Sequence, residues 1–502
     1  MRKIAHYVQG EALSVAGART QPVFNPSLGA PQATLELGDG EVVARAVKSA
    51  RLAQPEWAAV NPQRRARVMF EFKRLLEAHM DELAMMLAEE HGKVLADAKG
   101  ELQRGIDIVE FCCGAPHLLK GEYSERVGPG IDVYSMRQPL GVVAGITPFN
   151  FPAMVPLWML APAIVCGNAF VLKPSERDPS VSQRLAELLI EAGLPPGILN
   201  IVQGDRVVVD ALLDHPDIKA ISFVGSTEIA QYVYERGAAR GKRVQAMGGA
   251  KNHGVVMPDA DLDQAVADIV GAAFGSAGER CMALPVVMPV GAATAEALRA
   301  RLIDAIAGLR VGVSTDPQAQ FGPVVSAPHK ARVESYIQLG VDEGAELVVD
   351  GRGFSLQGYE AGYFLGPTFF DHVTPTMRSY QEEIFGPVLQ MVRAASLDEA
   401  IRLVDQHPYG NGVAIFTRDG DTAREFASRI EVGMVGVNVP IPVPVAYHSF
   451  GGWKRSGFGD LNQYGMDGIR FYTRTKTVTQ RWPTQAAGAE PADQSFHFPT
   501  MR

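Results

Sequence analysis

The sequence is poor in cysteine, in clustered basic residues and in long apolar runs. Only 4 cysteines occur among 502 residues, and they show neither a disulfide framework nor zinc-finger spacing. Lys and Arg number 47 against 56 Asp and Glu, and this acidic balance argues against nucleic acid or an anionic membrane as a partner. The few cysteines also indicate a reducing compartment.

Targeting and membrane segments are not evident either. The first residues are polar and lack the apolar run of about 7–15 residues that a signal peptide needs. The most apolar segment, 151–172, contains Pro152, Pro156 and Pro162, which is unlike a membrane helix. We therefore expect a cytoplasmic protein that binds no membrane, and we expect no metal site.

What the sequence does contain is typical of a loop-rich α/β enzyme of about two to four domains. Hydrophobic residues make up 47 %, with 51 Gly and 33 Pro. From residue 141, short apolar runs alternate with helical patterns, which favours a parallel sheet with crossover helices. A looser repeat of the pattern after residue 254 predicts a second α/β unit.

The expected elements follow from this periodicity. The expected helices are 39–60, 62–91, 95–119, 152–166, 180–192, 207–214, 227–239, 262–274, 293–307, 329–343, 397–405 and 421–430. The expected strands are 142–146, 169–172, 199–202, 220–224, 254–257, 286–290, 347–349, 388–392, 413–416 and 434–437. An exposed hairpin at 121–138 could pair with a strand-forming stretch at 469–479, and 483–502 reads as a loose tail.

Four segments could carry chemistry, and each has a plain structural alternative. Cys281 follows three small residues and Arg280, so it is either a reactive thiolate or a buried structural cysteine. Asn150 lies between prolines after an expected strand. Its amide could donate to an oxyanion, and the alternative is that it is only a turn residue. Lys173 and Glu176 follow another strand, where they would hold ribose hydroxyls or form a solvated loop.

The fourth segment is Phe223–Thr227, where a strand ends and a helix begins. Free N–H groups at that helix start would bind a phosphate, and the alternative is that Ser226 only caps the helix. The usual dinucleotide fingerprint, Gly-x-Gly-x-x-Gly after a strand, is missing from the sequence. Each segment is a weak signal alone, but their order along the chain is informative.

Taken together, these segments resemble the aldehyde dehydrogenase superfamily from about residue 20 to 480. The motifs that carry the resemblance are Pro148–Pro152, Lys173–Glu176, Phe223–Thr227, Gly278–Cys281, Glu382–Pro387 and Phe450–Gly457. The resemblance implies an α/β fold with a Rossmann-type NAD-binding domain, a catalytic domain and a small β oligomerisation element. It places these at 1–120 with 141–246, at 247–465, and at 121–140 with 466–485, followed by a tail at 486–502.

The resemblance also implies a role for each matching residue. Cys281 would be the nucleophile, and Asn150 with the backbone N–H of Cys281 would hold the oxyanion. Lys173 and Glu176 would bind the adenosine ribose of NAD, and the Glu176 carboxylate would repel the 2′-phosphate of NADP. The other implied cofactor contacts are Thr147, Phe149, Arg177, Gly225, Ser226 for the pyrophosphate, Gly248, Glu383 for the nicotinamide ribose, and Phe385.

One departure from the superfamily indicates the subfamily. Met247 stands where the superfamily has the glutamate that activates water, and a thioether cannot act as a general base. A thiol could replace water, which points to coenzyme A as co-substrate. The segments Ala250–Ala260 and Arg280–Leu284 resemble the CoA-acylating methylmalonate-semialdehyde dehydrogenases.

That subfamily implies oxidation of methylmalonate and malonate semialdehyde to propionyl-CoA and acetyl-CoA, with loss of the carboxyl group. It serves valine and inositol breakdown and is typically homotetrameric. Arg280 and Arg104 are the candidates for binding the substrate carboxylate, because guanidinium suits a carboxylate, and the alternative is ordinary ion pairing. The rival functions are a hydrolytic semialdehyde dehydrogenase, a non-catalytic NAD-binding protein and an NAD-independent decarboxylase.

Overall fold

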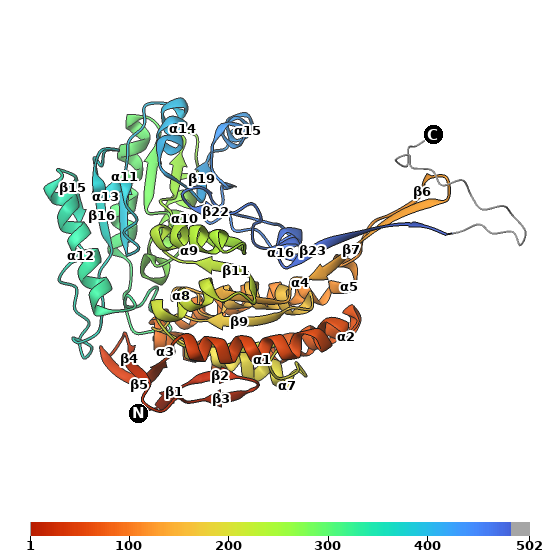
Figure 1. The fold of residues 1–502 in the computed structure, drawn as a ribbon. Coiled ribbons are helices and arrows are strands. Elements are labelled where there is room, and N and C mark those ends of the chain that lie inside the picture. The colour runs from red at the N-terminus through yellow and green to blue at the C-terminus, as the bar shows by residue number, and fades with distance from the viewer. Residues whose placement is uncertain (1, 483–502) are drawn as a thin grey trace, which may run out of the picture.

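The computed structural model describes residues 2–482, which build two large sheets, a small N-terminal sheet and a projecting arm (Figure 1). The first large sheet has eight strands in the order β22-β12-β11-β8-β9-β10-β2-β3, and its five central strands are parallel. Its strands are β2 (His6–Val8), β3 (Glu11–Leu13), β8 (Val142–Ile146), β9 (Ala169–Lys173), β10 (Leu199–Ile201), β11 (Ile218–Val224), β12 (Arg243–Met247) and β22 (Gly457–Phe458).

Helices pack around this sheet because β8 and β9 are buried along their whole length and need cover on both faces. Every residue of α6 is buried, as its apolar sequence requires. The helices that surround this sheet are α1 (Gly40–Ala59), α2 (Pro62–Ala78), α3 (Met80–His91), α4 (Leu95–Cys113), α5 (Ala115–Leu118), α6 (Met154–Val165), α7 (Ser180–Glu191), α8 (Arg206–Asp214) and α9 (Thr227–Ala239).

The second large sheet has seven strands in the order β15-β16-β17-β14-β13-β19-β20, parallel except for β15. Its strands are β13 (His253–Val256), β14 (Val286–Pro289), β15 (Glu346–Val349), β16 (Thr368–Asp371), β17 (Val388–Met391), β19 (Gly412–Phe416) and β20 (Met434–Val437). Its helices are α10 (Leu262–Phe274), η1 (Gly275–Gly278), α11 (Ala292–Ala307), α12 (Ala327–Asp342), α13 (Arg378–Gln381), α14 (Leu397–Gln406) and α15 (Gly420–Arg429).

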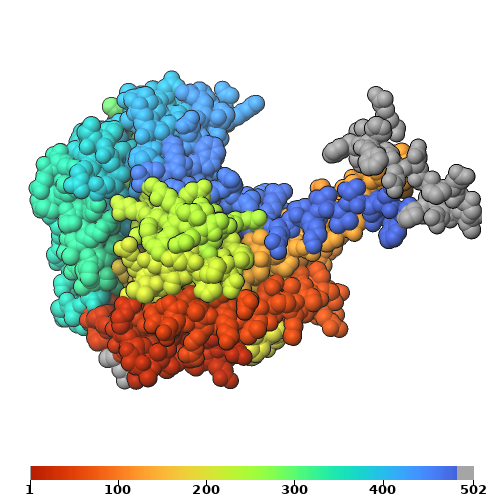
Figure 2. Space-filling view, in the orientation of Figure 1, coloured from red at the N-terminus to blue at the C-terminus, as the bar shows by residue number. Residues whose placement is uncertain are grey.

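A three-stranded antiparallel arm stands away from the body (Figures 1 and 2). It consists of β6 (Tyr123–Gly128), β7 (Ile131–Pro139) and β23 (Thr473–Arg481), with β7 in the middle. The predicted pairing of the hairpin with the C-terminal stretch is confirmed, since Thr473 lies opposite Pro139 and Arg481 opposite Ile131.

The remaining elements form two small sheets and one helix. They are β1 (Arg2–Ile4), β4 (Arg19–Asn25) and β5 (Ala30–Leu37), which form the N-terminal sheet, with β18 (Tyr409–Gly410), β21 (Trp453–Lys454) and α16 (Gly465–Phe471). None of the helices found between residues 2 and 482 combines the length and apolar character needed to cross a membrane.

Four expectations about these elements are corrected by the structure. The helix expected at 62–91 is two helices, because His79 leaves helical geometry and Met80 starts a new helix. The helix expected at 95–119 likewise breaks at Gly114. The expected strand 469–479 begins only at Thr473, because Ile469 and Phe471 turn inward on α16 and are fully buried. The strands before residue 38, and β12 and β16, were not expected.

Candidate active site

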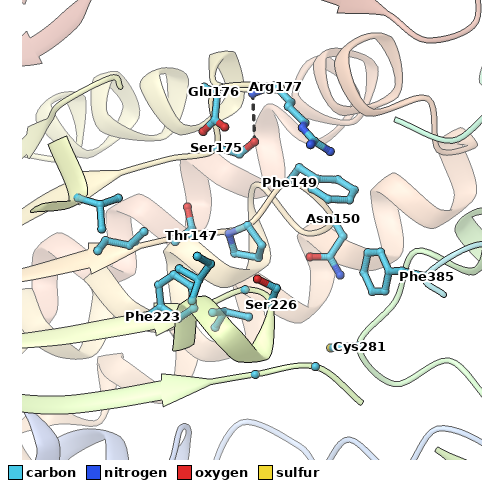
Figure 3. A pocket seen from close by; sticks show the side chains of 18 of the residues that line it. Thr147, Phe149, Asn150, Ser175, Glu176, Arg177, Phe223, Ser226, Cys281 and Phe385 are labelled. Atoms are coloured by element: carbon cyan, nitrogen blue, oxygen red, sulfur yellow. Dashed lines mark hydrogen bonds between the residues drawn. The ribbon is translucent and has the colours of Figure 1, made fainter. Parts of the chain in front are cut away.

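A cavity of about 760 Å³ opens at the carboxyl ends of β8, β9, β11 and β12, next to the second sheet. Twelve of the fourteen predicted site residues line it. They are Thr147, Phe149, Asn150, Lys173, Glu176, Arg177, Gly225, Ser226, Gly248, Cys281, Glu383 and Phe385. Figure 3 shows Glu176 and Arg177 at one end of the cavity and Asn150 and Cys281 at the other.

The candidate nucleophile, Cys281, follows a short strained segment. Ser276, Ala277 and Gly278 all have positive φ, and a Cβ on Gly278 would lie 2.1 Å from the carbonyl oxygen of Gly386. Glycine is therefore required where the two motifs touch. Beyond it, the carbonyl oxygen of Cys281 accepts hydrogen bonds from the amides of Asn252 and Asn411, at 3.0 and 3.1 Å. These contacts fix the backbone of the nucleophile.

The thiol of Cys281 is poorly acidic in this state. Burial, followed by the negative charge of Glu383, raises the pKa of Cys281 to about 11. The backbone N–H groups of Cys281 and Met282, and then Arg280, act in the opposite direction. The thiolate form of Cys281, which would attack a carbonyl, is therefore scarce at neutral pH in this state.

Asn150 lies across the cavity from Cys281, and its side chain points toward Cys281 in Figure 3. The residue is 4 % exposed. Within residues 2–482 its side-chain amide has no hydrogen-bond partner, whereas its carbonyl oxygen accepts a bond from Lys93. A buried amide with a free N–H in this place can donate to a developing oxyanion.

The far end of the cavity carries a charged pair suited to ribose hydroxyls. Lys173 ends β9, and its Nζ lies 3.1 Å from Glu176 Oε2. Burial would raise the pKa of Glu176, but Lys173 and backbone N–H groups outweigh it, and the pKa is lowered. Glu176 is therefore an ionised acceptor at neutral pH.

The start of α9 offers N–H groups to the middle of the cavity. Ser226 occupies the N-cap position but makes no capping hydrogen bond, so the N–H groups of the first turn lack a side-chain acceptor there. Thr227 is used elsewhere, because its Oγ1 accepts the N–H of Gly249 at 2.8 Å. Opposite, Thr147 Oγ1 is buried and has no hydrogen-bond partner within residues 2–482. Such groups suit a phosphate.

Glu383 and Phe385 come from the turn between α13 and β17. Glu383 Oε1 accepts the N–H of Ala250 at 2.9 Å, and a Cβ on Gly249 would lie 2.4 Å from Oε2. Burial raises the pKa of Glu383. Phe385 meets the Phe149 ring edge-on at 5.9 Å, and Arg177 lies over the same ring at 4.9 Å.

The strand β12 ends in a thioether and not in a carboxylate. Met247 is the last residue of that strand, is 8 % exposed, and its carbonyl oxygen accepts the N–H of Gly225 at 3.1 Å. The next residue, Gly248, lines the cavity, and the residue directly before it is a thioether. Among the lining residues, the carboxylates are Glu176, Asp205 and Glu383.

The two predicted arginines do not line this cavity. Arg104, on α4, donates to the carbonyl oxygen of Pro444 at 2.6 Å, and Arg280 donates to Asp97 at 2.8 Å. Arg280 does border a second, water-sized cavity of about 20 Å³ together with Cys281. Both guanidinium groups thus already have protein acceptors.

Sequence reasoning missed the residues that support this site. Asn252 and Asn411 hold the backbone of Cys281, Lys93 holds that of Asn150, and His329 and Arg332 line the cavity beside Glu383. The one available signal was Asn252, which lies within the segment Ala250–Ala260. The others stand far from the motifs in the sequence and only the fold brings them close.

Comparison with known proteins gives concordant matches. The sequence profile of the aldehyde dehydrogenase family matches residues 14–478. A malonate-semialdehyde dehydrogenase of Pseudomonas aeruginosa is 58 % identical over 501 residues, which is 100 % of each chain. A malonate-semialdehyde dehydrogenase 1 of Geobacillus thermodenitrificans is 50 % identical, covering 96 % of this chain and 99 % of the relative.

Two solved structures have the same fold similarity to this chain. One, described as a methylmalonate-semialdehyde dehydrogenase of Sinorhizobium meliloti 1021 complexed with NAD, has a TM-score of 0.96 and 60 % identity, covering 97 % of this chain and 99 % of that one. A methylmalonate-semialdehyde dehydrogenase of Oceanimonas doudoroffii has the same TM-score of 0.96, 58 % identity and the same coverage of 97 % and 99 %. The expected fold class is confirmed.

Proposed function

The chain belongs to the aldehyde dehydrogenase family, and on that premise we propose that it oxidises malonate and methylmalonate semialdehyde with NAD and transfers the acyl group to coenzyme A. The names of the Pseudomonas and Sinorhizobium proteins support the substrates. The observation that carries the coenzyme A step is Met247, the last residue of β12, which directly precedes the cavity-lining Gly248.

The cavity fits NAD in its chemistry. Lys173 and Glu176 would hold the adenosine ribose, the start of α9 at Gly225 and Ser226 would hold the pyrophosphate, and Glu383 and Phe385 would contact the nicotinamide half. Thr147, Phe149, Arg177 and Gly248 would line the path between them. The orphaned Thr147 hydroxyl is a site for a polar group of the ligand. NAD supplies the hydride acceptor.

The residues of the chain itself perform the covalent chemistry. The Cys281 thiolate adds to the aldehyde carbon, and the Asn150 amide with the Cys281 N–H holds the oxyanion that forms. When hydride has left, Cys281 carries the acyl group as a thioester. The substrate carboxylate is then β to the thioester carbonyl, so loss of carbon dioxide leaves an enolate that the same donors hold until it is protonated.

Release of the acyl group requires a second nucleophile. Water needs a general base, and Met247 cannot act as one. A thiol ionises far more readily than water and attacks as its own thiolate. Coenzyme A therefore takes the acyl group from Cys281, giving acetyl-CoA from malonate semialdehyde and propionyl-CoA from methylmalonate semialdehyde.

Arg104 and Arg280 are proposed to bind the substrate carboxylate. Arg280 adjoins Cys281 in the sequence, and each arginine presents a guanidinium with several donors, of which only some are used by Pro444 and Asp97. A carboxylate that binds Arg280 would compete with Asp97, which already accepts a hydrogen bond from it.

The domain division stays a proposal that the sheets support. The eight-stranded sheet, largely within residues 1–120 and 141–246, carries the ribose and phosphate contacts, and residues 247–465 carry Cys281 and Glu383. The arm of β6, β7 and β23 is proposed as the oligomerisation element of a homotetramer, because a long, exposed strand edge favours pairing with another chain. Light scattering should then give four times the 54.1 kDa chain mass.

The test is NADH formation from malonate semialdehyde and NAD, with and without coenzyme A, with the product identified by mass. Multiple turnovers that require coenzyme A and yield acetyl-CoA would support the proposal. Fast turnover without coenzyme A, with a free acid as product, would show that another group activates water. The Cys281→Ala variant is the control and should form no NADH.

A further inference from the structure

A buried ion pair holds the backbone of the loop that carries Asn150. Lys93 Nζ lies 2.6 Å from Glu101 Oε2 on α4 and donates to the carbonyl oxygen of Asn150 at 2.7 Å. The two charged side chains are only 1 % and 0 % exposed. The Lys93 ammonium group also lies 4.7 Å from the centre of the Phe151 ring.

The same pair holds the other end of the loop. Glu101 Oε1 accepts the N–H groups of Ala153 and Met154, at 2.8 and 3.1 Å. These are the first N–H groups of α6, whose N-cap residue, Ala153, has no side-chain oxygen to offer. The loop 150–154 is therefore fixed at its start by Lys93 and at its end by Glu101.

Helix α4 also reaches the opposite side of the reaction centre. Asp97 precedes Glu101 by four residues, so the two lie on one face of the helix. Asp97 accepts a hydrogen bond from Arg280, the neighbour of Cys281. One helix face thus holds both the loop of the oxyanion amide and the loop of the nucleophile, and it sets their separation.

We propose that Lys93 and Glu101 are positioning residues that fix the backbone of Asn150 and so aim its amide at the oxyanion formed on Cys281. Stability alone is a poor explanation of the pair, because apolar side chains of similar volume usually stabilise a core as well as a buried ion pair does. The Asn150 amide has no partner of its own within residues 2–482, so its aim depends on the backbone that the pair holds. This inference rests on the proposed function.

Loss of the ion pair should slow the reaction at least as much as a slight misplacement of the Asn150 amide, but less than its deletion. Loss of an oxyanion donor lowers the rate of a chemical step by about 10²–10³-fold, and displacement of a reacting group by ~1 Å lowers it by up to about 10²-fold. Freeing the Asn150 carbonyl should therefore slow hydride transfer by about 10- to 100-fold. The rate constant of hydride transfer should change, whereas the KM for NAD should stay within about twofold of the wild-type value.

The test uses the double variant Lys93→Met/Glu101→Gln. Removing one partner would leave a buried unpaired charge, whereas the double change removes both. The glutamine oxygen can still accept the N–H groups of Ala153 and Met154, so mainly the contact with Asn150 is lost. The measurement is the single-turnover rate of NADH formation in the full-length protein, with malonate semialdehyde and, in parallel, propionaldehyde.

The control is an exposed ion pair between α4 and the neighbouring helix α3. Lys99 on α4 and Asp81 on α3 lie 2.6 Å apart, and their side chains are 51 % and 88 % exposed. The variant Lys99→Met/Asp81→Asn should form NADH at the wild-type rate. A slow control would mean that any change between α3 and α4 disturbs the site, and the inference would be wrong.

The decisive measurement repeats the double change in an Asn150→Ala background. If the pair acts through the Asn150 amide, it should slow Asn150→Ala by no more than about twofold, because coupled sites are not additive. If the two losses multiply, the pair acts by another route and the inference is overturned. A merely structural role would give that second result.

A second variant covers the case in which the double variant does not fold. Glu101→Asp keeps the charge but shortens the side chain, so it cannot reach Lys93 and the start of α6 together. This variant should lower the single-turnover rate of NADH formation less than the double variant does, and it should not lower the rate of Asn150→Ala further. A further decrease in the Asn150→Ala background would refute the inference. Activity with propionaldehyde but not the semialdehyde would refute only the proposed substrate.

Discussion

The reactivity of Cys281 gives the sharpest test of the site's electrostatics. Burial and the Glu383 carboxylate raise the pKa of this thiol to about 11. The Glu383→Gln variant removes the charge but keeps an oxygen that can accept the N–H of Ala250. We therefore expect the pKa of Cys281 to fall and the thiol to react faster.

The size of the effect follows from the thiolate fraction. With a pKa of about 11, only about one Cys281 in a thousand is ionised at pH 8. A nearby like charge raises a pKa by about one unit or more, so Glu383→Gln should give roughly a tenfold higher rate of alkylation at pH 8. Because burial raises the pKa of Glu383 as well, the ratio of variant to wild type should grow with rising pH as Glu383 ionises.

The assay is alkylation of the protein by iodoacetamide without NAD, followed by mass and peptide mapping between pH 6 and pH 10. Cys112, Cys113 and Cys166 are buried, and burial raises the pKa of each of them, so they should react slowly. Cys281→Ala measures that background.

Glu382→Gln is the matched control, because this carboxylate is the sequence neighbour but binds Tyr336 and Arg378 instead. It should leave the alkylation profile unchanged. The reasoning would be refuted by a wild-type rate that levels off near pH 8, since the thiol would then already be ionised. A Glu383→Gln variant slower than wild type would refute the role assigned to Glu383.

Three further predictions follow from single contacts. Gly278→Ala should lower the melting temperature by several degrees and abolish NADH formation, because its Cβ would meet the carbonyl of Gly386 at 2.1 Å and φ is positive; a fully active variant would contradict the strained turn. Glu176→Gln should raise the KM for NAD and reduce the preference for NAD over NADP, because an ionised acceptor is lost. The preference is measured as the ratio of kcat/KM for NAD to kcat/KM for NADP, and an unchanged ratio would show that Glu176 does not contact the ribose. Arg104→Lys should lower kcat/KM for malonate semialdehyde by about 10- to 100-fold and spare propionaldehyde, and equal losses would show that Arg104 only holds the carbonyl of Pro444.

The local sequence determined most of the elements and most of the residues that line the cavity. Apolar runs such as 142–146 and 169–172 became buried parallel strands because their composition suits burial on both faces. The motifs that follow these strands converge at one sheet edge because parallel strands end on the same side. That Met247 replaces a general base stays a prediction from its residue type.

The tertiary structure decided the secondary structure of some segments and the contacts between residues that are distant in the sequence. The stretch at 469–471 has strand propensity, but α16 forms there because Ile469 and Phe471 gain more by burial in the core. Lys93 reaches Asn150 across 57 positions and Arg280 reaches Asp97 across 183. Periodicity reports which face of an element is apolar, whereas such contacts depend on how elements distant in the chain are packed together.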